Sequence, residues 1–68
     1  MREVVIRAGT IRLGQFLKLA DLVDAGGDAK ALLAQQVVKV NGETEPRRGR
    51  QLVRGDVVGV GDDYVRVG

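Results

Sequence analysis

The spacing of apolar residues changes once along this chain. Around Leu13 and again around Leu33, apolar residues recur at intervals of three or four, which is the period of one face of an α-helix. From Val38 onward, apolar and polar residues alternate, which is the period of a strand with one buried face. Helices in one stretch followed by strands in the next are typical of the α+β class, so we expect an α+β fold.

The predicted elements form one domain, residues 1–68, in which two helices pack on one face of a small, mostly antiparallel sheet. The core must be aliphatic, because the chain has a single Phe, a single Tyr and no Trp. We expect Leu17, Leu33 and Val40 to be buried. We also expect Thr10 to cap the first helix, since its side-chain oxygen can accept a hydrogen bond from an exposed amide of the first turn. The expected elements are a strand at 4–6, helices near 10–21 and 26–35, and strands at 38–40, 57–60 and 64–67.

The dipeptide Asn41-Gly42 follows the strand at 38–40 and predicts a hairpin. A two-residue loop would place Glu43 and Glu45 on the same face as the valines of that strand. A three-residue loop would place Thr44 opposite the last of these valines and turn both acids toward solvent. We therefore expect the three-residue loop, with Gly42 at positive φ.

The residue types that the chain lacks exclude several kinds of chemistry. There is no Cys and no His, so a thiol nucleophile, an imidazole base and the common zinc ligand sets are absent. The only aliphatic hydroxyls belong to Thr10 and Thr44. We expect a protein that is not an enzyme and that uses no cofactor and no metal. The first residues contain no apolar stretch long enough for a signal peptide or a membrane span, so we expect a cytoplasmic protein with no membrane partner.

Positive charge is concentrated after the predicted hairpin, although the formal net charge is only +2. Residues 39–54 carry five cations against two acids. Three of these cations, Arg47, Arg48 and Arg50, fall in one loop, and arginine suits phosphate because its planar guanidinium can donate two hydrogen bonds at once. Charge alone leaves two interpretations open, a face for an anionic partner or an ordinary solvated surface.

Glycines lie in or beside both predicted helices. Gly14 falls inside the first helix, where it costs about 1 kcal/mol relative to Ala and would permit close approach of a backbone or a ligand. Gly26 and Gly27 border the start of the second helix, one turn before Lys30, and free amides at such a start can bind a phosphate. Taken by themselves, the same residues are better explained by an ordinary glycine-rich connection.

Four short motifs, in the same order and without gaps, carry a resemblance to a known family. The chain resembles the RNA-binding domain named after ribosomal small-subunit protein S4, and especially a small stand-alone bacterial form of it. Gly26 stands where the family often has Arg. Gln36 stands where the second helix usually ends in Gly, so Gln36 either adopts a left-handed conformation or the helix ends differently. The matching residues are Arg12, Leu13, Leu17, Ala29, Lys30, Val38, Val40, Asn41, Gly42, Gly55 and Asp56.

The resemblance implies an RNA-binding surface on the two helices and the adjoining hairpin. By position, it nominates Arg12, Gly27, Lys30 and Lys39, and the charge argument adds Arg47, Arg48 and Arg50. The one aromatic residue expected at the surface, Tyr64, does not make a base-stacking platform. We therefore expect recognition of structured RNA, of the ribosomal or transfer RNA class, through its backbone and shape.

Two other functions fit the same residues. The basic loop could meet an acidic partner in a protein assembly, or the chain could be a targeting piece for an RNA-modifying enzyme, since similar domains occur as appendages of such enzymes. A ribosomal protein or an RNA-modifying enzyme would be the partner in these cases. We expect the chain itself to be a monomer.

Overall fold

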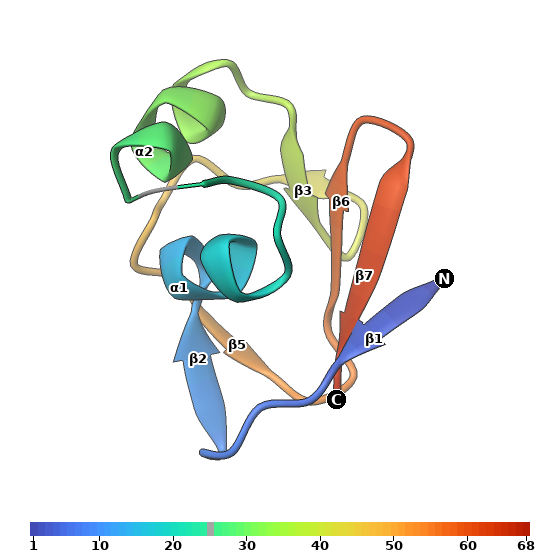
Figure 1. The fold of residues 1–68 in the computed structure, drawn as a ribbon. Coiled ribbons are helices and arrows are strands. Elements are labelled where there is room, and N and C mark those ends of the chain that lie inside the picture. The colour runs from blue at the N-terminus through green and yellow to red at the C-terminus, as the bar shows by residue number, and fades with distance from the viewer. Residues whose placement is uncertain (25) are drawn as a thin grey trace.

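The computed structural model describes residues 1–24 and 26–68. The described residues contain two helices and seven short strands (Figure 1). In chain order these elements are β1 (Arg2–Val4), β2 (Thr10–Arg12), α1 (Leu13–Leu19), α2 (Gly26–Ala34), β3 (Val38–Val40), β4 (Glu43–Thr44), β5 (Gln51–Val53), β6 (Val57–Val60) and β7 (Asp63–Val67).

Five of the strands form one sheet in the order β1-β7-β6-β3-β4, and β2 and β5 form a separate two-stranded ribbon. Every pairing is antiparallel except that of β1 with β7, which is parallel. Both helices lie on one side of the larger sheet, and the ribbon runs beneath α1 (Figure 1). The α+β class and the mostly antiparallel sheet are therefore confirmed.

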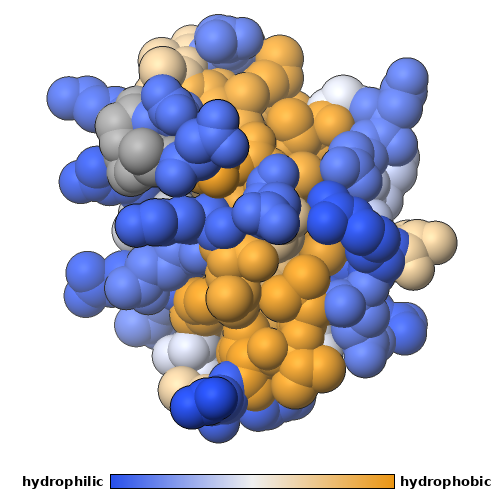
Figure 2. Space-filling view, in the orientation of Figure 1, coloured by the Kyte–Doolittle hydropathy of each residue, from blue (hydrophilic) through white to orange (hydrophobic). Residues whose placement is uncertain are grey.

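The core lies between the helices and the sheet and is almost entirely aliphatic, as the composition predicts. Its one aromatic side chain, Phe16, is fully buried, and the predicted core residues Leu17, Leu33 and Val40 are all buried. Figure 2 shows apolar residues also reaching the surface of one face, in a band with hydrophilic residues on both sides. The buried hydrophobic residues are Ile6, Leu13, Phe16, Leu17, Ala20, Ala29, Leu33, Val38, Val40, Leu52, Val58, Val65 and Val67.

The start of the first helix differs from the prediction. Residues 10–12 form strand β2, which pairs with β5, so α1 begins only at Leu13 and Thr10 does not cap it. Arg12 occupies the cap position and makes no side-chain cap hydrogen bond. The pairing of β2 with a strand some forty residues later overrides the local capping preference of threonine. The first strand also lies earlier than predicted, at 2–4 instead of 4–6.

The hairpin also differs from the prediction. Val40 pairs with Glu43, so the loop has two residues, Asn41 and Gly42, instead of three. Both loop residues have positive φ, +52° and +87°, as a type I′ turn requires, and positive φ at Gly42 is confirmed. The short loop turns Glu45 toward the core, where it is buried. The prediction assumed that an acidic side chain would not be buried beside the valines. It was wrong because Glu45 forms ion pairs with Arg47 and Arg50 in the loop that follows, and these pairs compensate its buried charge.

The end of the second helix answers the question that Gln36 raised. Helix α2 ends at Ala34, close to the predicted bound, and Gln36 has φ of +61°. Its amide still donates to the carbonyl of Leu33, at 3.1 Å, so the helix ends in the left-handed conformation without a glycine. Neither helix among the described residues is long and apolar enough to cross a membrane.

Candidate nucleic-acid interface

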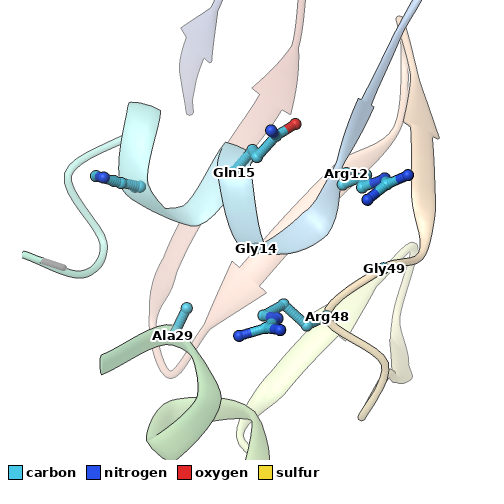
Figure 3. A pocket seen from close by; sticks show the side chains of 7 residues that line it. Arg12, Gly14, Gln15, Ala29, Arg48 and Gly49 are labelled. Carbon is cyan, nitrogen blue, oxygen red and sulfur yellow. The ribbon is translucent and has the colours of Figure 1, made fainter. Parts of the chain in front are cut away.

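A groove of about 360 Å³ lies where the start of α1, the first turns of α2 and the loop between β4 and β5 meet. Three side chains at the groove are cationic, and all three are exposed: Arg12, Lys18 and Arg48. Figure 3 shows Arg48 reaching from its loop into the space between the two helices. The groove is lined by Arg12, Gly14, Gln15, Lys18, Ala29, Arg48 and Gly49.

Gly14 allows the loop to lie against α1. Its amide donates to the carbonyl of Arg48 at 2.9 Å, and the amide of Leu13 donates to the carbonyl of Arg50 at 2.8 Å. These two amides belong to the first turn of α1, where no partner exists within the helix, so the loop supplies the cap that Thr10 does not. A Cβ on Gly14 would overlap Cγ of Arg48 and lie 3.1 Å from its Cδ. The close approach that Gly14 permits is thus that of the Arg48 backbone and side-chain stem.

The three arginines of the loop do not have the same surroundings. The carboxylate of Glu45, whose side chain is only 6% exposed, accepts hydrogen bonds from the guanidinium groups of Arg47 and Arg50. It also accepts one from the backbone amide of Arg47, at 3.1 Å. Arg48 makes no ion pair within the part of the chain that the structure describes. Arg48 is therefore the loop arginine whose charge faces the groove uncompensated.

The same contacts keep Glu45 ionised. Hydrogen bonds from the Arg47 side chain and backbone, and then from Arg50, lower the pKa of Glu45 from 4.5 to about 2. Burial acts in the opposite direction, because it disfavours the charged form of a carboxyl group. The hydrogen bonds outweigh burial, so the carboxylate holds both arginines at any pH above the acid range.

The structure brings together some of the predicted site residues and separates others. Arg12 and Arg48 share the groove, and Lys30 lines an adjoining hollow of about 260 Å³ that Arg48 also borders. Gly27 lies in the first turn of α2. Lys39 lies between two buried residues of β3, so its side chain points to the face of the sheet away from the helices. The groove and the Lys39 face are therefore different surfaces.

A family model described as the S4 domain matches residues 4–68. The chain belongs to the S4 domain family. Over 48 residues it is 58% identical to the probable ribosome maturation protein RlbA from Bacillus subtilis (strain 168), a match that covers 71% of this chain and 68% of the relative.

The fold resembles that of the 30S ribosomal protein S4e from Thermoplasma acidophilum, with a TM-score of 0.66 and 23% sequence identity. That match covers 88% of this chain and 32% of the ribosomal protein, so the chain spans about a third of that protein's length. The comparison supports the S4 fold of this chain and carries no residue roles with it.

Two features of this S4 domain were not predicted from the sequence. Lys18 was not among the predicted site residues, although it lies one helical turn after Gly14 and therefore on the same side of α1. Glu45 was predicted to face solvent and instead organises the loop. A signal for Glu45 does exist in the sequence, since three arginines follow it within five residues.

Proposed function

We propose that this S4 domain binds structured RNA through phosphate groups that enter the groove between α1, α2 and the loop at residues 45–50. The observation that carries the proposal is that Arg12, Lys18 and Arg48 line one groove, none of them in an ion pair within the described residues. Exposed cations on a concave surface attract phosphate oxygens and release the counterions that surround RNA.

Recognition of the backbone and shape of the RNA fits this surface better than recognition of its bases. Phe16 is fully buried, and Tyr64, which is half exposed, lies over Gly59 on the neighbouring strand. The groove is therefore lined by cations, one glutamine and small residues, without an aromatic ring on which a base could stack. Double-stranded RNA is recognised mainly through its phosphates and shape, and the groove suits that mode.

Ribosomal RNA is the target that we propose, in preference to transfer RNA. Support comes from the 58% identical relative, which is named as a probable ribosome maturation protein. The proposed role is binding without catalysis, in keeping with a sequence that has no Cys and no His. The groove is built from a single chain, so we propose that the domain binds as a monomer.

Salt dependence of binding to a folded RNA hairpin tests this proposal. With three to five phosphate contacts, the logarithm of the binding constant should fall with the logarithm of salt concentration with a slope of about −2 to −4. Replacing Arg48 with Ala should weaken binding to different RNA sequences to a similar extent, because phosphate contacts position the RNA without reading it.

The matched control is Arg66→Ala, which removes the same charge from β7, where Arg66 pairs with Glu3. This variant should bind like the unmodified protein. Binding that is insensitive to salt, or equal losses from Arg48→Ala and Arg66→Ala, would contradict an RNA site at the groove. Co-purification separates the other functions, because a single protein partner without RNA would favour an assembly module.

A further inference from the structure

The loop at residues 45–50 is held at two places. On its inner side, Glu45 accepts 3.0 Å and 3.1 Å hydrogen bonds from Nη1 of Arg50 and Nε of Arg47. On its outer side, the carbonyls of Arg48 and Arg50 accept hydrogen bonds from the first amides of α1. Between these anchors, Arg48 is the residue whose side chain crosses Gly14 and enters the groove.

We propose that Glu45 is a positioning residue of the RNA-binding surface, one that withdraws Arg47 and Arg50 from phosphate and leaves Arg48 as the phosphate ligand of the loop. The proposal rests on the proposed function, since it states how the same groove selects its cations. The three arginines carry the same charge in the sequence, but within the described residues Arg48 alone makes no ion pair and is free to contribute its charge fully.

Burial is the reason that Arg47 and Arg50 remain with Glu45. The Glu45 side chain is 6% exposed, so an arginine that turned to an RNA phosphate would leave a buried carboxylate with fewer partners. A buried charge that loses its partner is strongly destabilising, whereas Arg48 has no ion pair with any described residue to give up. A phosphate that approaches the loop therefore gains most from Arg48.

Arg50 and Arg47 differ in how accessible their side chains remain to solvent and to a phosphate. The Arg50 side chain is 31% exposed and the Arg47 side chain 73% exposed, so Arg47 still presents part of its guanidinium to solvent. Because one carboxylate faces two guanidinium groups, the loop keeps a net charge of about +2 and not +3. The contribution of the loop to counterion release should thus come chiefly from Arg48 and only partly from Arg47.

Single substitutions at the three arginines measure these contributions. Binding to a folded RNA hairpin is measured across a range of salt concentrations for Arg47→Ala, Arg48→Ala and Arg50→Ala. Loss of Arg48 should make the log–log slope shallower by about 0.9, the value for one phosphate contact. Loss of Arg47 or Arg50 should change the slope by less than half as much. Equal changes for all three variants would overturn the proposal.

Glu45→Gln then tests whether Glu45 causes the difference. Glutamine keeps the shape of the side chain and removes its charge, so Arg47 and Arg50 should become available and the slope should steepen by about 0.5 to 1. In the Glu45→Gln background, Arg47→Ala should make the slope shallower by as much as Arg48→Ala does in the unmodified protein. A lower melting temperature with unchanged slopes would show that Glu45 only stabilises the fold, and would overturn the positioning role.

Gly14→Ala provides a test that removes no charged group. The added Cβ displaces the Arg48 stem, so the slope should become shallower as in Arg48→Ala. Gly9→Ala is the control, because a Cβ at Gly9 meets no atom within 4 Å. A folded Gly14→Ala protein with unchanged affinity and slope would contradict the role of Arg48. No salt-dependent binding by the unmodified protein would instead overturn the proposed function, and this inference with it.

Discussion

Two regions of this molecule hold arginine–carboxylate pairs, and they differ in burial. At the β1–β7 edge, Arg2 pairs with Asp63 and Arg66 pairs with Glu3, with all four side chains about half exposed. In the loop after β4, the carboxylate of Glu45 is almost fully buried. Exposed pairs contribute little to stability because water and salt screen them. The same pair of residue types can therefore cover a surface in one place and fix a loop in another.

The largest effect on stability is expected from Glu45→Ala. This change removes the acceptor of three side-chain hydrogen bonds and of the Arg47 amide, and it leaves a cavity where a carboxylate was buried. We expect a loss of about 2–3 kcal/mol, near the lower end for a broken buried pair because Arg47 remains solvated. Thermal unfolding should show a melting temperature lower by roughly 10–20 °C. A shift of only a degree or two would show that the Glu45 pairs contribute no more to stability than the exposed pairs at the sheet edge do.

A smaller effect is expected from acid. The pKa of Glu45 is about 2 in the folded protein and 4.5 ordinarily, so the unfolded chain takes up the proton first as the pH falls. The stabilisation is therefore complete above about pH 4.5 and is lost as the pH falls toward 2. After allowance for screening at Arg47, we expect a loss of about 1–2 kcal/mol over this window.

Urea unfolding at several pH values measures the acid effect, and Glu45→Gln is its control. Glutamine does not titrate, so the variant should lack this part of the pH dependence and keep only that of the other carboxyl groups. An identical pH profile for the two proteins would show that Glu45 is not the group responsible.

The smallest effect is expected at the exposed pairs. Glu3→Gln and Asp63→Asn each remove one carboxylate from a half-exposed pair at the sheet edge. Each should change the free energy of unfolding by about 0–1 kcal/mol, and high salt should reduce even that difference. A loss as large as that of Glu45→Ala at either position would remove the distinction between the two regions.

The fold could be predicted from the sequence where the spacing of apolar residues within one element indicates its secondary structure. The apolar face of α1 and the alternation in β3 gave the α+β class, the buried residues and the positions of both helices to within a few residues. Prediction failed where the local structure depends on pairing with a segment that is distant in sequence. Thr10 enters a ribbon with β5 instead of capping α1, and no local pattern at 10–12 contains that information.

The sequence indicates several charged residues of the candidate site, but it does not show how they pair with one another. The sequence identifies a cluster at Arg47, Arg48 and Arg50, and it places Arg12 at the start of the first helix. The prediction from alternating faces in a hairpin assumed that acidic side chains point to solvent. It therefore missed that Glu45 is buried and paired with Arg47 and Arg50. Which arginine remains free depends on that burial, and hence on the packed structure.

The parallel pairing of β1 with β7 affects how the chain can fold during its synthesis. Strand β1 leaves the ribosome before the other strands, yet its partner β7 is made more than fifty residues later, and the core residues Val58, Val65 and Val67 lie in β6 and β7. Contacts this distant in sequence form slowly, after local helices. A nascent chain held with β7 still in the exit tunnel should therefore remain open to protease, and emergence of β7 from the tunnel should close the domain in one step.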